Sequence, residues 1–149
     1  MTPLKTILSL VLVLFLGAQA DAQIRKIPSA VTEAFKTKYS AASNVEWKDR
    51  ITSFSAVFEA NGKKQEAFFD SDGEWKYTYI DIEDTEIPEA VTEGLDKSKY
   101  DEWDVERVQK IEKNDNTTEY RIIVKKGDIR KKSLLFTSDG KLRKDNYKL

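Results

Sequence analysis

Two segments of this sequence occur twice, in the same order. The segment Ile27–Glu33 (IPSAVTE) returns 60 residues later as Ile87–Glu93 (IPEAVTE), and Phe69–Gly73 (FDSDG) returns 67 residues later as Phe136–Gly140 (FTSDG). A fixed order of anchors with about seven residues gained between them is typical of duplication followed by changes in loop length. The sequence therefore predicts two copies of one structural unit.

Each predicted unit begins with a short helix. Pro28 and Pro88 suit the first helical position, because proline there loses no needed N–H group and has its φ angle already set. Val31 and Phe35 recur at helical spacing in the first copy, and the second copy repeats the pattern. Gly94 costs about 1 kcal/mol of helix propensity relative to alanine, so the second helix is predicted to be the weaker one.

After each helix, apolar residues alternate with polar ones, which is typical of strands. The breaks between the strands carry glycine in short Asn-Gly and Ser-Asp-Gly turns, where a hairpin needs a positive φ angle. The predicted strands are residues 45–50, 52–60, 63–69 and 74–80 in the first copy, and 104–112, 118–125, 129–137 and 141–147 in the second.

This order of elements predicts an α+β protein of two tandem units, each a short helix packed on a four-stranded antiparallel meander. Residues 23–86 would form the first unit and residues 87–149 the second. A unit of about 60 residues is only marginally stable alone. Because no Pro-, Gly- or Ser-rich linker separates the copies, we expect one domain with a single continuous or closely paired sheet. The face of the sheet away from the helices would be partly open.

The first 22 residues are predicted to be a secretory signal peptide. Lys5 precedes an apolar run from Ile7 to Leu16, and small residues follow up to Ala22. The run is about half of the roughly 20 residues that a membrane-spanning helix needs, and no later segment is continuously apolar, so no membrane span is expected. The protein is predicted to be exported to the periplasm or the extracellular space. The chain has no cysteine, so disulfide bonds and thiolate sites are excluded.

Charge is balanced over the whole chain but not along it. The net charge is −1, yet residues 81–106 hold eleven acidic and two basic side chains, whereas residues 120–149 hold ten basic and three acidic ones. This separation predicts one negative and one positive face. The balanced total and the export signal favour solubilising lysines on strands over a nucleic-acid interface, so no nucleic-acid partner is expected.

Few residues are suited to catalysis or metal binding. The chain has no histidine and no cysteine, which removes the usual general base, the thiol nucleophile and most transition-metal ligands. A carboxylate pair remains, but a glycosidase-like site needs two acids about 5–9.5 Å apart in a cleft. Residues 70–73 (DSDG) resemble the start of a calcium loop, yet position twelve would be Asp81 instead of glutamate, so a hairpin turn is favoured. We expect no catalytic residue, no metal ion and no cofactor.

Aromatic residues are concentrated in the first copy, which holds ten of the fifteen outside the predicted signal peptide. The phenylalanines expected in the core under the helix are Phe35, Phe54, Phe58 and Phe69. A second group has amphipathic rings in predicted strands and consists of Trp47, Trp75, Tyr77 and Tyr79. Rigid aromatic rings anchor many protein interfaces, so this second group supplies the candidate partner-binding residues, on the uncovered sheet face. Cross-strand packing without a partner is the alternative.

The order of these motifs resembles the PepSY-like, beta-lactamase-inhibitor-like family of secreted bacterial proteins. The matching features are the tandem Ile-Pro-x-Ala-Val helix starts, the Glu46-Trp47 strand, an aromatic strand and residues 69–75 (FDSDGEW). The resemblance covers nearly all of the chain after the predicted signal peptide, although Trp75 becomes Leu142 in the second copy. It implies the fold of beta-lactamase inhibitory protein. It suggests inhibition of a peptidase or beta-lactamase by analogy of fold only, and fold alone does not carry function.

The predicted function is that of an exported, non-catalytic binding module with a protein or peptide partner. Such a module would inhibit or sequester a periplasmic or extracellular protein, such as a peptidase. The alternative is a structural or stress-associated envelope domain without a specific ligand.

Overall fold

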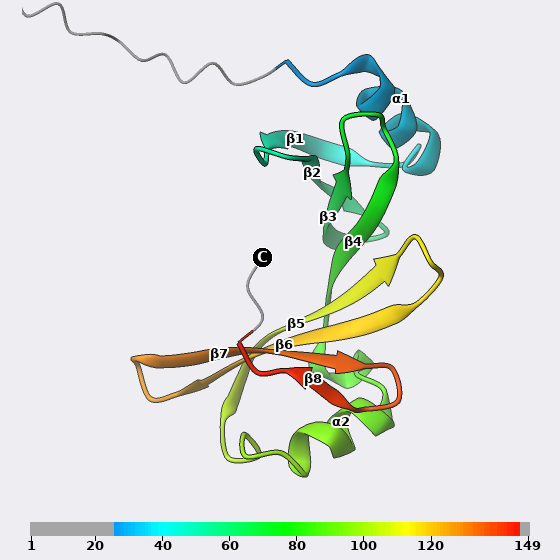
Figure 1. Cartoon of the computed structure of the whole chain (residues 1–149). Helices are drawn as coiled ribbons and strands as arrows, with labels where there is room; N and C mark the ends of the chain where they lie inside the picture. The colour runs from blue at the N-terminus through cyan, green and yellow to red at the C-terminus, as the bar shows by residue number, and fades with distance from the viewer. Residues whose placement is uncertain (1–25, 147–149) are drawn as a thin grey trace, which may run out of the picture.

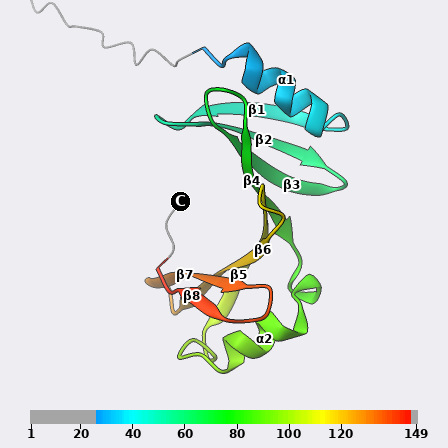
Figure 2. The ribbon, with the colours of Figure 1, turned by 45° about the vertical axis from the view of Figure 1, so that its right-hand side comes forward.

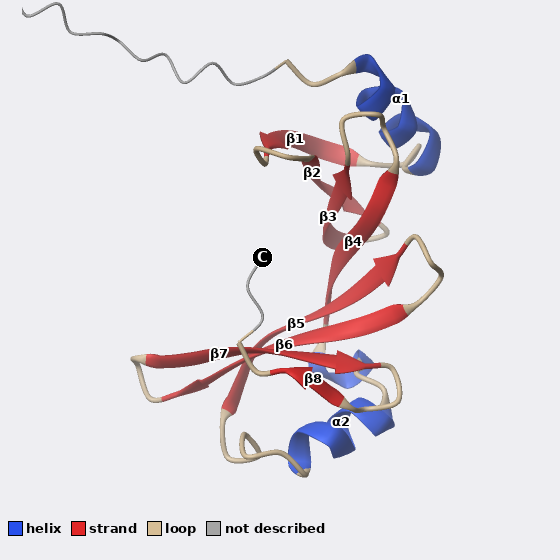
Figure 3. Cartoon of the chain, viewed as in Figure 1, coloured by secondary structure: helices blue, strands red, loops and turns tan. Residues whose placement is uncertain are grey.

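The computed structural model describes residues 26–146, so the predicted signal peptide lies outside the described residues. Two α-helices, one short 3-10 helix and eight strands form an α+β fold (Figures 1 and 3). The helices are α1 (Ser29–Lys38), η1 (Asp84–Glu86) and α2 (Glu89–Asp96). The strands are β1 (Ser43–Asp49), β2 (Phe54–Ala60), β3 (Lys63–Phe69), β4 (Trp75–Ile82), β5 (Asp104–Lys113), β6 (Thr118–Lys126), β7 (Arg130–Thr137) and β8 (Leu142–Lys144).

All eight strands belong to one antiparallel sheet. Their order across the sheet is their order in the chain, from β1 to β8. The expectation of a continuous sheet is thus confirmed, and each predicted strand is present, with ends displaced by at most three residues. Both prolines precede the first helical residue by one position, and the Pro28 and Pro88 carbonyls accept the first backbone hydrogen bonds of their helices.

The sheet is strongly curved, and both helices lie on its outer side (Figures 1 and 2). The inner side carries no helix among the described residues. We call this inner side the concave face. Its buried apolar residues are Phe68, Tyr79, Ile111 and Leu135, with Tyr77 packed against them. Among residues 26–146, no helix is both long and apolar enough to cross a membrane.

Each α-helix covers its own apolar cluster on the outer side of the sheet. The cluster under α1 contains Val31, Phe35, Phe54, Ala56, Phe58, Ala67 and Phe69, so the four predicted core phenylalanines are confirmed. The cluster under α2 contains Val91, Leu95, Tyr100, Val108, Tyr120, Ile122, Val124, Leu134 and Phe136. The second cluster is mainly aliphatic where the first is mainly aromatic.

Within each copy, the repeated segment that begins the helix contacts the repeated segment that forms the later turn. Gly73, in the β3–β4 turn, lies so close to α1 that an added Cβ atom would be 2.6 Å from the Ala30 carbonyl oxygen. Gly140, in the β7–β8 turn, approaches Ala90 of α2 more closely still, and its Cβ atom would be 2.6 Å from the Ala90 carbonyl carbon. Both glycines have positive φ angles, 86° and 83°. The repeat therefore encodes one helix–turn contact, made twice.

Gly94 belongs to this same contact. A Cβ atom there would overlap the carbonyl oxygen of Gly140. The glycine that weakens the helix by its propensity is therefore the residue that lets α2 approach the β7–β8 turn.

The acidic and basic segments of the chain do not form separate faces at the strands where they meet. Glu102 binds Lys126 at 3.3 Å, and Glu106 binds Lys131 at 2.5 Å. The reason is the topology of the sheet, because acidic residues around the start of β5 lie beside the basic ends of β6 and β7. Here the prediction of one negative and one positive face is wrong.

Candidate functional site

The structure divides the four predicted contact residues between the two faces of the sheet. Trp47 and Trp75 pack against the cluster under α1, whereas Tyr77 and Tyr79 belong to the concave face. Strict alternation along β4 would have placed residues 75, 77 and 79 on one face. The premise of a single aromatic surface is therefore corrected, while a binding role for the individual residues stays a prediction.

A β-bulge causes the division. Phe68 lies opposite Tyr77, but its neighbour Phe69 lies opposite Trp75, so Lys76 is an extra residue in β4. An extra residue reverses the facing of the strand beyond it. Trp75 consequently turns toward α1, while Tyr77 turns toward the concave face.

Trp47 and Trp75 are held by contacts within the protein. The Trp47 ring meets Phe35 edge to face, with 5.3 Å between ring centroids. The Trp75 indole N–H donates a hydrogen bond to the Thr78 hydroxyl at 2.8 Å. The Lys38 ammonium lies 3.7 Å from the centroid of the Trp75 ring, within the range of a cation–π contact. These contacts support packing roles for both tryptophans.

Tyr39 shares this hydrogen-bond cluster, and its hydroxyl lies 2.5 Å from the Thr78 hydroxyl. Burial raises the pKa of Tyr39 from 10.0 to about 12, partly opposed by the hydrogen bond to Thr78. The folded protein therefore keeps this proton at pH values where the unfolded chain has begun to lose it. Folding stability must fall as pH rises between these two pKa values.

We expect Tyr39→Phe to remove this part of the pH dependence. Urea unfolding at pH 9 and pH 11 should show a smaller loss of stability in the variant than in the wild type, because phenylalanine has no proton to release. Other tyrosines and lysines titrate in the same range in both proteins, so the difference between the two slopes is the relevant quantity. Equal slopes would contradict the assignment.

On the concave face, one partly exposed ring lies over buried ones. Tyr77 stacks on Phe68, with 4.6 Å between ring centroids, and meets Tyr79 edge to face at 5.5 Å. Phe68 and Tyr79 are only 6% and 2% exposed. Tyr77 therefore offers an aromatic surface whose orientation is set by packing below it.

Polar side chains beside these rings form a connected network across β4 to β7. Arg121 donates hydrogen bonds to Ser133 at 2.9 Å and to the Gln109 side chain at 2.9 Å. Gln109 in turn donates to Asp81 at 2.7 Å, and Arg107 binds both Asp81 oxygens. The Arg121 guanidinium lies 5.8 Å from the centroid of the Tyr79 ring. The network fixes the charged groups of the concave face in place.

A second network lies toward β1. Arg50 donates hydrogen bonds to Ser55, at 3.1 Å, and to Glu66, and Ser55 donates to the same Glu66 oxygen at 2.8 Å. The guanidinium of Arg50 is 5.7 Å from the centroid of the Phe68 ring. The two arginines, Arg50 and Arg121, thus cover the buried rings from either side.

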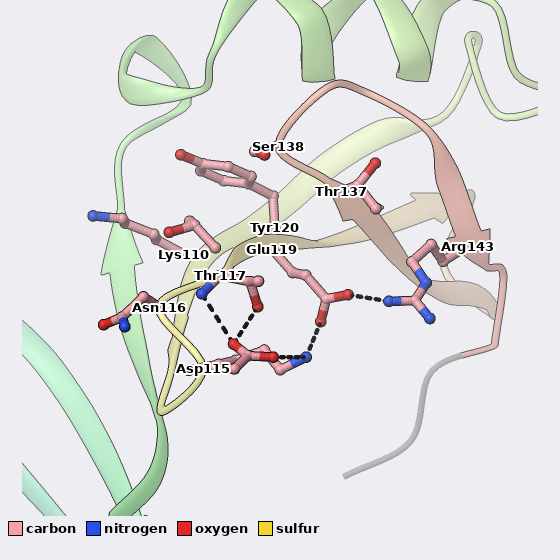
Figure 4. A pocket seen from close by; sticks show the side chains of 11 residues that line it. Lys110, Asp115, Asn116, Thr117, Glu119, Tyr120, Thr137, Ser138 and Arg143 are labelled. Atoms are coloured by element: carbon pink, nitrogen blue, oxygen red, sulfur yellow. Dashed lines mark hydrogen bonds and ion pairs between the residues drawn. The ribbon is translucent and has the colours of Figure 1, made fainter.

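A hollow of about 260 Å³ opens beside Tyr77. Its lining residues are Tyr77, Ile111, Lys113, Glu119, Leu135, Arg143 and Lys144. It adjoins a larger hollow of about 720 Å³ next to the β5–β6 turn, which Figure 4 shows. The lining residues that the two hollows share are Lys113, Glu119 and Arg143. Glu119 binds Arg143 at 2.8 Å and Lys113 at 3.7 Å. The smaller hollow is therefore lined by more cationic than acidic side chains, and Ile111 and Leu135 form its apolar part.

The carboxyl groups with a resolved pKa shift are poorly suited to acid catalysis. A general acid that works near neutral pH needs a raised pKa. Every described carboxyl group with a resolved shift has a lowered pKa, as in Asp115, where a hydrogen bond from Thr117 favours the charged form. Within residues 26–146, no cluster of three acidic side chains is arranged to hold a metal ion.

The DSDG segment forms the hairpin turn that the sequence predicts. The Asp70 carboxylate accepts hydrogen bonds from the backbone N–H groups of Asp72 and Glu74, both at 3.0 Å. The same carboxylate binds Lys76 at 3.1 Å. In the second copy, Thr137 replaces Asp70, and its hydroxyl accepts the Lys141 N–H group at 3.1 Å.

Sequence reasoning missed much of the concave face. Phe68, Ile111, Leu135 and the cations around them were not identified. One signal was available for Phe68, because neighbouring strand residues face opposite sides. With Phe69 in the helix-covered core, Phe68 had to point to the other face. The remaining residues come together only across strand pairs far apart in the chain.

Comparison with known proteins places this architecture in a family. The model of a family described as "Putative beta-lactamase-inhibitor-like, PepSY-like" matches residues 52–144, which is more than half of the chain. No curated protein matches the chain.

Two crystal structures of Bacteroides proteins share the fold. A "putative periplasmic" protein from Bacteroides eggerthii is 25% identical, with a TM-score of 0.76 over 81% of this chain and 88% of the other. A BLIP-like protein from Bacteroides fragilis is 29% identical, with a TM-score of 0.70 over 80% of this chain and 85% of the other. Together with the family match, these similarities agree with the resemblance read from the repeated motifs. The chain belongs to the PepSY-like, beta-lactamase-inhibitor-like family.

Proposed function

We propose that the protein is an exported, non-catalytic binding module, in which residues 1–22 form a cleaved signal peptide. Residues 23–86 and 87–149 would be two copies of one unit. The matching contacts of Gly73 with α1 and Gly140 with α2 support this division. Export is supported by the apolar run near the N-terminus and by the periplasmic description of the relative from Bacteroides eggerthii.

The partner is a protein or peptide that binds the concave face around Tyr77. The observation that carries this proposal is the partly exposed Tyr77 ring, held on buried Phe68 and bordered by fixed polar networks. A surface that is ordered before binding loses little side-chain entropy when a partner arrives. Tyrosine is also among the residues that most often dominate binding energy. The family description supports inhibition or sequestration of another protein, such as a peptidase, as the purpose.

Capture from periplasmic extract tests the proposal. Immobilised wild-type protein should retain a defined partner, and Tyr77→Ala should reduce its recovery at least about tenfold, as for loss of an interface residue worth more than about 1.4 kcal/mol. Tyr77→Phe keeps the stacked ring and should retain most of the capture. Trp75→Phe, on the outer side, is the matched control and should capture normally. Equal recovery with wild type and Tyr77→Ala would reject the proposed face.

A structural envelope domain without a specific ligand is the second candidate. The observation in its favour is that the concave face is largely satisfied by its own contacts. Its apolar residues Phe68, Ile111 and Leu135 are only 2–6% exposed, and Arg50 covers Phe68. Under this alternative, neither wild type nor the Tyr77 variants would retain a partner.

A further inference from the structure

We propose that the protein forms a symmetric homodimer by antiparallel pairing of β1 with β1 of a second copy. β1 is the outermost strand on one side of the sheet, and its residues Ser43 to Glu46 are exposed. The backbone groups on the outer side of an edge strand have no neighbouring strand, and pairing with another chain satisfies them. This inference concerns a different surface from the concave face and does not depend on the proposed function.

One exposed apolar side chain lies in this edge strand and another lies just after it. Among the described residues, the large hydrophobic side chains that are exposed are Val45 (40%), Ile51 (86%) and Ile129 (94%). Val45 lies within β1, and Ile51 lies just after it. Ile51 also has a φ angle of 67°, a conformation that branched residues rarely adopt. A second copy paired along β1 would cover part of the Val45 side chain, which lies opposite Asp49 in the register described below.

The charges of β1 are complementary to themselves. Glu46 and Lys48 lie two positions apart, so both point to the same face of the sheet. Neither has an ion pair within residues 26–146, whereas other inward-facing charged residues of the sheet do, such as Glu66 with Arg50 and Asp81 with Arg107. An antiparallel second copy can place Glu46 opposite Lys48 and Lys48 opposite Glu46, giving two new pairs.

Among the registers centred on residues 46, 47 and 48, charge favours one. In a continuous sheet, residues directly opposite each other point to the same face. The two-fold axis of the dimer must therefore lie midway between one β1 residue and the same residue of the second copy. An axis at Glu46 would oppose two glutamates, and an axis at Lys48 would oppose two lysines. An axis at Trp47 instead opposes Glu46 to Lys48 twice and places the two Trp47 residues side by side. The regular pairing of residues 46–49 with β2 leaves this stretch extended for such pairing.

The opposite edge of the sheet explains why assembly would stop at two copies. β8 has only three residues, Leu142–Lys144, and offers too short a template for another strand. Pairing β1 with β1 is also isologous, so it uses up the edge on both copies. The result is a closed dimer and not an open fibre. The eight-stranded sheets of the two copies join at β1 to form one sheet of sixteen strands.

Charge reversal tests both the dimer and its register. In sedimentation velocity up to about 1 mM protein, the wild type should shift toward twice the monomer mass, because a short interface associates weakly. Glu46→Lys alone and Lys48→Glu alone should each raise the dissociation constant about tenfold or more, since each opposes like charges at two positions. The double variant restores both pairs in reversed order and should dimerise like the wild type.

Lys141→Glu is the matched control, because Lys141 is an exposed lysine in the β7–β8 turn, at the other end of the strand order from β1, and should leave the dimer unchanged. Circular dichroism confirms that each variant is folded. A wild type that stays monomeric throughout the concentration range would overturn the proposal, leaving the β1 charges as protection against edge pairing. Single reversals without effect, or a double variant that does not recover, would overturn the register.

Discussion

Replacing Gly140 by alanine is expected to destabilise the protein by about 2–5 kcal/mol. Two effects add at this position. Gly140 has a φ angle of 83°, which disfavours any residue with a Cβ atom, and that Cβ atom would overlap the Ala90 carbonyl group of α2. Neither the turn nor the first residues of α2 can relieve the overlap without losing the contact between them. Urea unfolding followed by far-ultraviolet circular dichroism measures the loss.

Gly127→Ala is the matched control for this prediction. Gly127 also lies in a hairpin turn with a positive φ angle, 62°, but an added Cβ atom there meets nothing within 4 Å. It should lose only about 1–2 kcal/mol, from backbone conformation alone. The difference between the two variants isolates the helix–turn contact. Equal losses would mean that the contact contributes nothing beyond the turn itself.

Replacing Phe35 by alanine is expected to cost about 3–5 kcal/mol. The Phe35 ring is 5% exposed and lies 5.0 Å from Phe58, 5.3 Å from Tyr39 and 5.3 Å from Trp47, measured between ring centroids. Removing it leaves a cavity between these rings and also deletes the edge-to-face contacts that Phe35 makes with Phe58 and Trp47. A lower urea midpoint, with loss of the near-ultraviolet circular dichroism of the aromatic cluster, is the expected measurement.

Phe35→Leu separates the loss of volume from the loss of the ring. Leu95 occupies the equivalent position in α2, so leucine is compatible with this kind of helix face. The leucine variant should lose about 1–2 kcal/mol, less than the alanine variant. If alanine and leucine cost the same, the aromatic contacts and not the filled volume would be the source of stability.

Much of the architecture could be predicted because the relevant signals are local. Glycine in the Ser-Asp-Gly turns, proline before each helix and the change from helical to alternating spacing all act over a few residues. They located both helices and all eight strands, and the strand 63–69 was predicted with the bounds that β3 has. The longest error is at the last strand, which ends at Lys144 in the structure and was predicted to continue to residue 147.

The candidate site was predicted only in part, because the face of the sheet to which a side chain points is not set by the local sequence alone. Tyr77 and Tyr79 lie on the uncovered face as expected, but Trp47 and Trp75 lie on the other. A single extra residue in β4, Lys76, makes Trp75 point to the opposite face of the sheet from Tyr77. The sequence of β4 alone does not predict this bulge, because the bulge arises from the register between β3 and β4.

The sequence by itself determined the repeated helix-and-strand order, the turns and the lack of reactive side chains, because these follow from residue type and short-range spacing. Only the tertiary structure decided which rings share a face, which acidic and basic segments pair, and why Gly94 is needed in α2. Those features depend on distances between segments that are remote in the chain. Gly94 is the clearest case: its propensity predicts a weak helix, but its missing Cβ atom is what allows α2 to approach the Gly140 carbonyl.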